Sequence, residues 1–368
     1  MLAIIKIIIS IYVMWKVSSS FDLAANYITR NWGEGIKGPT INAIASSLPE
    51  LLISSMFLFY YKDIIGFSAG YATIIGSSAF NIAIIPVVSY AIVFYKNRNV
   101  EFKIDKKIIF QDSIFLLISI IILLSGFIIG VNIYLSILLI SLYCMYVYFV
   151  YSSRKKSSNI HEINEKIFNE KILKGKGKYT SSILNIRLFD ILNMKKINNL
   201  NSYIVIFISV ILIGSSCWIL VEAVDNISTS YNISLFITAF FIAAISSSIP
   251  DTILSVKDAK HEKFADSFSN SYGSNIFDIC IGIGLPVLIF SIFYDSSSIE
   301  MNIPIDTVGF LNIGDYIAGG NLFLWSLIIL FIFTSVVSIV YYTGKINLKN
   351  SIIILLVYLM FIIALLGF

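Results

Sequence analysis

Ten long runs of apolar residues, separated by polar segments, follow one another along the chain. They lie at 2–21, 39–60, 66–95, 108–129, 133–151, 203–224, 233–256, 264–294, 322–342 and 351–367. Each run is close to the ~20 residues that an α-helix needs to cross the hydrocarbon core of a bilayer. The pattern predicts an all-α integral membrane protein with ten transmembrane helices.

The composition excludes an ordinary soluble protein. Of the 368 residues, 57% are hydrophobic and 13% are charged, whereas soluble domains carry roughly 25% charged residues. The longest polar stretch, 152–202, divides the ten runs into five and five. We therefore expect a five-helix unit at 1–151, a basic loop at 152–202 with some amphipathic helix near 183–194, and a second five-helix unit at 203–368.

Lysine and arginine gather in alternate loops. The loops at 96–107, 152–202, 257–263 and 345–349 are basic, whereas those at 130–132, 225–232 and 295–320 contain no Lys or Arg. Because basic loops stay on the cytoplasmic side, we expect loop 152–202 to be cytoplasmic and both termini to lie outside. The acidic loop 295–320 is expected to be a solvated turn.

The net charge of +4 is concentrated in these loops, so it is a topology signal and does not indicate a nucleic-acid partner. We expect the partners to be inorganic cations and membrane lipid, with no obligate protein partner.

Two polar motifs recur inside the apolar runs. S-S-L-P-E at 46–50 and G-S-S-A-F-N at 76–81 are matched in the second half by S-S-I-P-D at 247–251 and G-S-N-I-F-D at 273–278. Since each half has an odd number of spans, the two copies cross the membrane in opposite directions. Inverted repeats with broken helices near the midplane are the usual plan of secondary transporters. We therefore expect two inverted five-helix repeats, kinked at Pro49 and Pro250.

Within each motif, oxygen-bearing side chains share a helix face because they are three or four residues apart. Carboxylates and hydroxyls are hard oxygen donors, which suit calcium and sodium far better than zinc or copper. Histidine and cysteine are absent from the motifs. The pairs are Ser47 with Glu50, Ser77 with Asn81, Ser248 with Asp251, and Ser274 with Asp278.

The three acids Glu50, Asp251 and Asp278 would bring three negative charges into a region of low dielectric. Such a cluster is costly unless cations or protons neutralise it, and we expect Asp278 to carry a proton when a divalent ion is bound. Single serines or asparagines inside a membrane often serve only as contacts between helices. Three acids in two copies of one spaced pattern favour ion binding instead.

The two motif pairs resemble those of the cation/calcium exchanger superfamily, especially the prokaryotic sodium/calcium exchangers and the potassium-dependent animal branch. The resemblance covers about 38–89 and 240–291 together with the ten-span layout. It implies an antiporter, with no enzymatic activity and no cofactor, in which spans two, three, seven and eight form the ion-binding core. Spans one and six would slide across this core to alternate access.

The resemblance also implies which positions bind the transported ions. Glu50 and Asp251 match the central carboxylates of the family. The other implied ligands are the hydroxyls of Ser47, Ser77, Ser248 and Ser274, the side chains of Asn81 and Asp278, Ser46 and Ser247 at the family's threonine positions, and the backbone carbonyls of Ala43 and Ala244.

This sequence departs from the family pattern at the helix breaks. The glycine that precedes the motif hydroxyls in the family is replaced by Ala45 in the first half and Ser246 in the second. Asp251 stands where glutamate is commoner, although the potassium-dependent branch also has aspartate there. Asp278 is shared by the prokaryotic and the potassium-dependent branches, so potassium coupling stays open.

We expect exchange of Ca²⁺ for Na⁺, and three other functions remain open. A carrier coupled to protons or potassium, for Mg²⁺, Mn²⁺ or Ca²⁺, would need a similar oxygen site. A cation channel would also line its path with acids, but it needs no inverted halves. An intramembrane aspartyl protease could use Asp251 and Asp278, but the sequence Gly-x-Gly-Asp is absent around both. Asp22 and Glu222, near the ends of spans one and six, are candidates for helping ions reach the site.

Overall fold

The computed structural model describes residues 2–30, 36, 38–96, 98, 102–153, 179–194, 196–294 and 321–367, and almost all of them are helical. The predicted acidic loop 295–320 and most of the basic loop 152–202 lie outside the described residues. Within the described part, nine helices are long and apolar enough to cross a membrane, and one bent pair makes a tenth span.

The first half of the chain contributes five spans, of which the second is broken. A π-helical turn, one α-helical turn and a longer α-helix follow one another there, with a bend of 47°. The elements are α1 (Leu2–Ile28), η1 (Gly38–Asn42), α2 (Ala43–Ser46), α3 (Leu48–Tyr61), α4 (Ile64–Lys96), α5 (Lys106–Ile129) and α6 (Ile133–Ser153).

The second half repeats this order of elements. Its second span again passes through a π-helical turn and one α-helical turn before the longer helix begins. The elements are α10 (Asn199–Tyr231), α11 (Leu235–Thr238), η2 (Ala239–Ala243), α12 (Ala244–Ser247), α13 (Ile249–Lys260), α14 (Phe264–Phe277), η3 (Asp278–Ile283), α15 (Gly284–Phe293), α17 (Asn321–Tyr341) and α18 (Leu348–Leu366).

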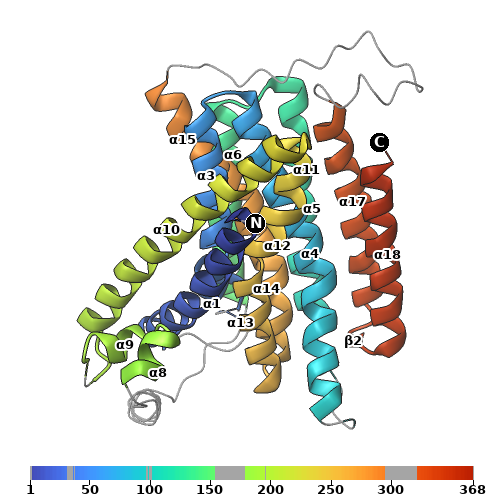
Figure 1. Ribbon diagram of the computed structural model, residues 1–368. Helices are drawn as coiled ribbons and strands as arrows, with labels where there is room; N and C mark the ends of the chain where they lie inside the picture. The colour runs from blue at the N-terminus through green and yellow to red at the C-terminus, as the bar shows by residue number, and fades with distance from the viewer. Residues whose placement is uncertain are drawn as a thin grey trace.

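The two halves run in opposite directions. In Figure 1, α4 descends from the top of the molecule to the bottom, whereas its counterpart α14 rises and continues into α15 at the top. Two short strands, β1 (Phe102–Lys103) and β2 (Lys345–Ile346), pair antiparallel and join the loops after α4 and α17 at the lower end. The predicted fold class, ten membrane helices in two inverted five-helix repeats, is confirmed.

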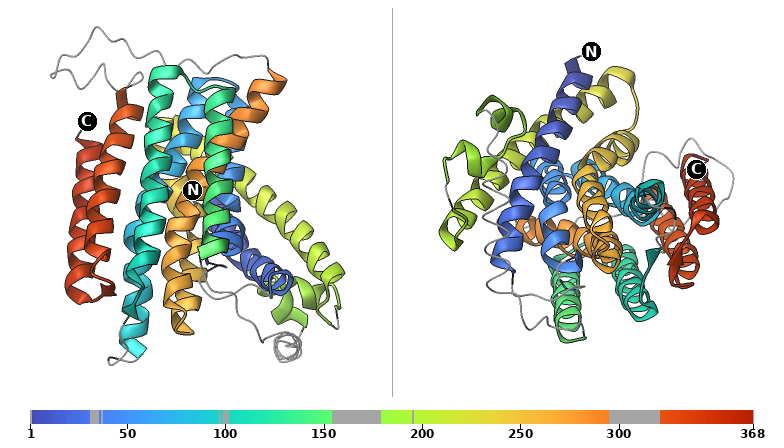
Figure 2. Two further views of the ribbon diagram at one scale, coloured as in Figure 1. Left: turned by 180° about the vertical axis from the view of Figure 1, so that it is seen from behind. Right: turned by 90° about the horizontal axis from the view of Figure 1, so that it is seen from below.

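The first helices of the two halves form a separate pair. Helices α1 and α10 pack side by side along their length and lie at a steep angle to the other helices (Figures 1 and 2). Helices α17 and α18 stand at the opposite side of the molecule. The centre is formed by the broken second spans, whose longest helices are α3 and α13, and by α4 and α14. These helices pack around one another, and α14 and α4 also pack against the π-helical turns η1 and η2.

Two glycines allow the halves to interlock at the centre. A Cβ atom on Gly76 of α4 would lie 2.3 Å from the carbonyl oxygen of Phe240 in η2, and one on Gly273 of α14 would lie 2.5 Å from Cα of Pro39 in η1. Only a residue without a side chain permits such close approach of two backbones. The same contact is thus made twice, once by each half on the other.

Several predicted boundaries were wrong. Helix α1 continues past the expected end at residue 21 to Ile28, and α10 covers 199–231 instead of 203–224. Long spans fit a bilayer by tilting, and the polar residues Asp22 and Asp225 within these extensions find partners inside the protein. The amphipathic helix expected near 183–194 is two short pieces, α8 (Tyr179–Leu184) and α9 (Leu188–Ile191), separated at Ile186, which has a positive φ of 46°.

A candidate cation-binding site between the two halves

The helix breaks place a serine at the same point of each half. Ser47 separates α2 from α3 with φ −87° and ψ 4°, and Ser248 separates α12 from α13 with φ −78° and ψ −3°. Any L-residue can adopt these angles. Ala45 and Ser246, which stand where the family has glycine, lie within the α-helical turns α2 and α12, so neither position needs a glycine. Pro49 and Pro250 follow within the first turn of the next helix, where a missing N–H costs little.

The three predicted acids come from three different helices and meet at the centre. Glu50 lies in the first turn of α3, Asp251 in the first turn of α13, and Asp278 begins η3. All three side chains have no exposed surface. Among the described residues, none of them forms an ion pair with a lysine or arginine, so their negative charge is not balanced by the protein.

Ser77 of α4 connects these elements. Its hydroxyl lies 3.3 Å from Oε1 of Glu50, 2.9 Å from the hydroxyl of Ser248 and 3.5 Å from Oδ2 of Asp278. The Nδ2 of Asn81, one turn further along α4, donates to the Ser77 hydroxyl at 3.2 Å and to Oδ2 of Asp251 at 3.1 Å. Glu50 and Asp251 therefore face one shared polar cage.

Four oxygen atoms of this cage are buried and have no hydrogen-bond partner among the described residues. They are Oγ of Ser47, Oε2 of Glu50, Oδ1 of Asn81 and Oδ1 of Asp278. A buried acceptor without a donor costs roughly 1–3 kcal/mol, and more when it is charged. A cluster of four such oxygens is therefore what a bound cation would stabilise.

The other predicted residues lie around this cage. Ser274 donates to Oδ1 of Asp251 at 2.8 Å. Ser247 lies close to the carboxylate of Glu50, and Ser46 lies close to that of Asp251, so each half lends a hydroxyl to the acid of the other half. The hydroxyl of Ser46 also donates to the carbonyl of Asn42, the last residue of η1, at 2.7 Å, and that of Ser247 donates to the carbonyl of Ala244 in α12 at 3.1 Å.

The carbonyl groups of Ala43 and Ala244 already have partners. Each accepts a hydrogen bond from the backbone N–H of the serine at the helix break, Ser47 at 2.9 Å and Ser248 at 3.1 Å. A carbonyl oxygen has two lone pairs, and each of these carbonyls also accepts from a serine hydroxyl, Ala43 from Ser46 at 3.4 Å and Ala244 from Ser247 at 3.1 Å. Ion binding at these two positions stays a prediction.

Three buried polar residues were not predicted from the sequence. Asn275 receives a hydrogen bond from Asn81 at 3.1 Å and donates to the carbonyl of Ser78 at 2.9 Å, so it ties α14 to α4 beside the acids. Asn270 donates to Ser255 at 3.0 Å. Asp112 lies apart from the cage and accepts from Tyr146 at 3.0 Å and Ser269 at 2.6 Å.

Asn275 stands between two predicted ligands in its motif, and Asp112 is an acid inside an apolar run. Either feature would have been a reason to predict that the residue is buried and hydrogen-bonded.

The donor set is unlike a transition-metal site. Among the described residues, no group of three His, Cys, Asp or Glu side chains has the arrangement that would hold a metal ion by itself. The cage instead mixes carboxylate, hydroxyl and amide oxygens, the donor types of hard cations. Asp22 and Glu222 lie outside it and pair with Lys257 and Lys6.

A ten-span protein with inverted halves, broken helices and a buried acidic cage between them belongs to the class of membrane transporters. A family model described as "Sodium/calcium exchanger protein" matches residues 2–152 and 201–367. The chain belongs to this family, and through it to the cation/calcium exchanger superfamily.

Curated relatives match shorter stretches of the chain. The sodium/calcium exchanger Calx of Drosophila melanogaster is 33% identical over 109 residues, which are 29% of this chain and 12% of Calx. The sodium/potassium/calcium exchanger 1 of Gallus gallus is 33% identical over 99 residues, 27% of this chain and 15% of that protein. The matched stretches thus span a small part of these relatives.

Solved structures match the fold over nearly the whole chain. An H⁺/Ca²⁺ exchanger, CAX, aligns with a TM-score of 0.69 and 15% identity over 99% of this chain and 82% of that one. The sodium-calcium exchanger NCX_Mj aligns with a TM-score of 0.59 and 21% identity over 98% of both chains. The fold is therefore shared with an H⁺/Ca²⁺ exchanger and with a sodium-calcium exchanger, whose names give different coupling ions.

Proposed function

We propose that this protein is a secondary antiporter that exchanges Ca²⁺ for Na⁺ across a membrane by alternating access. The observation that carries the proposal is the set of four buried oxygens without donors on Ser47, Glu50, Asn81 and Asp278, gathered beside Asp251. Hard cations take such mixed oxygen ligands. The sodium/calcium exchanger family, to which the chain belongs, supports calcium and sodium as the ions.

In this proposal the ions bind at the oxygens of both halves. Glu50 and Asp251 are the central carboxylates, and Asp278 and Asn81 complete the ring with the hydroxyls of the motif serines. Since both ions would use overlapping ligands, they compete, and binding of one displaces the other. An empty cage keeps three unbalanced carboxylates, so moving it past an apolar barrier is costly. This cost couples the two ion movements.

The tilted pair α1 and α10 is the moving part in this mechanism. The pair packs along its own length and touches the centre through the broken second spans, most of all through α3, α11 and α13. Sliding of the pair across the centre would open the cage first to one side and then to the other. Rigid elements moving around a fixed site are a recurrent form of alternating access.

We also propose that the lower end in Figure 1 is cytoplasmic and that both termini lie outside. The pairing of β1 with β2 brings the basic segments after α4 and α17 to one face. The end of α13 and the start of α14, with Lys257, Lys260 and Lys263, lie at this same end. Basic residues on one face support the assignment.

Calcium flux into liposomes containing the purified protein tests the function. With sodium inside and calcium outside, we expect calcium uptake that stops when internal sodium is replaced by choline. A pH gradient or a potassium gradient alone should drive no uptake. Uptake driven by the pH gradient without sodium would contradict sodium coupling and would indicate a proton-coupled exchanger.

Two variants make this test specific to the cage. Glu50→Gln removes a central charge at nearly constant size, and we expect it to abolish exchange. Glu222→Gln removes a carboxylate that is 51% exposed on α10 and pairs with Lys6 outside the cage. We expect exchange to be retained, which would also show that Glu222 does not help ions reach the site. Ion currents with discrete single-channel steps would contradict the proposal and would indicate a channel.

A further inference from the structure

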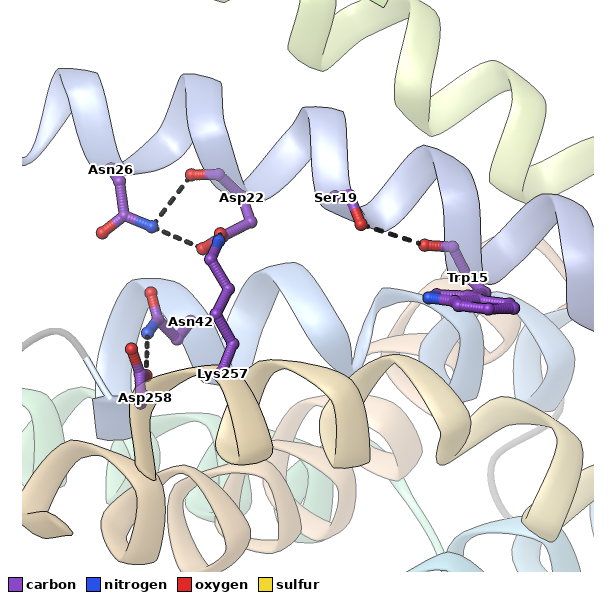
Figure 3. Close-up of polar contacts among 7 residues, drawn as sticks. All are labelled: Trp15, Ser19, Asp22, Asn26, Asn42, Lys257 and Asp258. Carbon is purple, nitrogen blue, oxygen red and sulfur yellow. Dashed lines mark hydrogen bonds and ion pairs between the residues drawn. The ribbon is translucent and has the colours of Figure 1, made fainter. Parts of the chain in front are cut away.

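One side-chain contact ties the tilted pair to the centre at the cytoplasmic end. Lys257, near the end of α13, reaches across to the carboxylate of Asp22 on α1 and forms an ion pair with it (Figure 3). Asp22 is only 3% exposed, whereas Lys257 is 46% exposed. Asn26 of α1 donates to the same Asp22, both to its carboxylate and to its backbone oxygen.

A second contact ties the pair to the centre at the opposite end. Tyr61, the last residue of α3, donates its hydroxyl hydrogen bond to the carboxylate of Asp225 on α10. Helix α10 ends at Tyr231, so Asp225 lies near its outer end. In Figure 1, the end of α3 lies at the top of the molecule and the end of α13 lies toward the bottom.

The two contacts are counterparts under the internal repeat. Helices α1 and α10 are the first spans of their halves, and α3 and α13 are the broken second spans. In both cases an aspartate in the last turns of the first span bonds to the end of the second span of the other half. We call Asp22 with Lys257 the cytoplasmic latch, and Asp225 with Tyr61 the outer latch.

We propose that these latches are positioning contacts that set which side of the membrane the cation cage faces. The inference rests on the proposed function, because it takes α1 and α10 as the moving pair. Each latch joins a moving helix to the fixed centre at one face, so the pair cannot slide away from that face while the latch is closed. Both latches are closed here, which describes a state shut on both sides.

The surroundings of Lys257 give it an alternative when the cytoplasmic latch opens. Asp258, the next residue of α13, accepts a hydrogen bond from Nδ2 of Asn42 at 3.3 Å. Oδ1 of Asn42 is buried and accepts no hydrogen bond from the part of the chain that the structure describes. Figure 3 places both residues below the ion pair. Lys257 can therefore exchange Asp22 for acceptors of the centre, while the buried carboxylate of Asp22 keeps the hydrogen bond from Asn26.

Apparent calcium affinity measured from each side of oriented proteoliposomes tests the latches. Lys257→Gln weakens the cytoplasmic latch, and we expect the half-saturating calcium concentration to fall on the cytoplasmic side and rise on the outer side. Tyr61→Phe removes the outer hydrogen bond and keeps the ring, so the shifts should have the opposite signs. If a substitution changes the free-energy difference between the two facing states by one to two kcal/mol, the half-saturating calcium concentrations should shift by roughly 5- to 30-fold.

Lys6 and Glu222 provide a matched control. This ion pair, at 2.6 Å, joins α1 to α10 within the moving pair. Glu222→Gln should therefore leave both affinities unchanged. The charge swap of Asp22→Lys with Lys257→Asp should restore the wild-type ratio if the pairing itself matters, and this variant also shows that the single substitutions had not simply unfolded the protein.

Amide hydrogen exchange of the protein in detergent tests the latches independently of which ions are transported. Lys257→Gln should speed exchange in peptides of α13, and Tyr61→Phe should speed it in peptides of α3, with no cargo ion present. Equal shifts on both sides, or the same effect from Glu222→Gln, would overturn the latch proposal while sodium-driven calcium uptake still stood. Opposite shifts without sodium-driven uptake would support the latches and refute the ion assignment.

Discussion

Asp251 and Asp112 are both fully buried carboxylates, and each accepts hydrogen bonds on both oxygens. Their surroundings differ in charge. Asp251 shares its cage with Glu50 and Asp278. Asp112 on α5 instead accepts hydrogen bonds from Tyr146 of α6 and Ser269 of α14. Like charges held together destabilise the cation-free protein, while isolated charge-assisted hydrogen bonds stabilise it. The two acids should therefore respond differently to neutralisation.

We expect Asp251→Asn to lower calcium affinity at least about tenfold, a change of roughly 1.4 kcal/mol or more. The unfolding temperature without calcium should stay the same or rise, because repulsion in the cage decreases. Asp112→Asn should lower the unfolding temperature, through a loss of about 1.5–3 kcal/mol for bonds to a charged group, and leave affinity unchanged. Thermal unfolding with and without calcium measures both. A folded Asp112→Asn protein with equally weak binding would contradict this assignment.

At the scale of the elements, two contacts between the halves hold the cage together. Helix α4 packs on the π-helical turn η2, and helix α14 packs on η1. The atoms opposing Gly76 and Gly273 are backbone atoms of Phe240 and Pro39, at 2.3 Å and 2.5 Å from a hypothetical Cβ. Backbone atoms of packed helices cannot move aside as the tip of a side chain can. A methyl group at either glycine must therefore push the halves apart.

We expect Gly76→Ala and Gly273→Ala each to abolish calcium uptake and to lower the unfolding temperature. Gly214→Ala is the control, since its Cβ would meet only Cδ1 of Leu52 at 3.9 Å. Calcium uptake and thermal unfolding, measured on all three variants in parallel, check this. Normal uptake by Gly76→Ala would mean that the contact between α4 and η2 is not needed for function.

Much of this arrangement could be predicted from the sequence, because the motifs repeat with their spacing. The ten spans and the inverted halves follow from apolar run length and from an odd number of spans per half. The meeting of Glu50 with Asp251 is implied by the resemblance of the two motif pairs to the family. The pairing of Asp22 with Lys257 and the bridge made by Asn275 could not be predicted. Both depend on helix tilt and rotation, which are set by packing and leave no periodicity in the sequence.

At the scale of the whole molecule, sidedness can be measured directly. Tyr134, in the first turn of α6, is 77% exposed at the upper end, and Leu348, where α18 begins, is 60% exposed at the lower end. In a protein lacking Cys144, a membrane-impermeant thiol reagent added outside should label Tyr134→Cys. Leu348→Cys should react only after permeabilisation. The reverse pattern would place both termini and the acidic loop in the cytoplasm.

The cage holds three acids, two from the second half and one from the first, because Asn81 stands where its counterpart is Asp278. Matching elements in both halves point to duplication of an ancestral gene. Two identical subunits inserted in opposite orientations could supply acids only in even numbers, since every substitution would appear in both subunits. Fusion into one polypeptide removed that constraint. A transport site with an odd number of acidic residues is therefore possible in the single-chain descendant but not in a homodimeric ancestor.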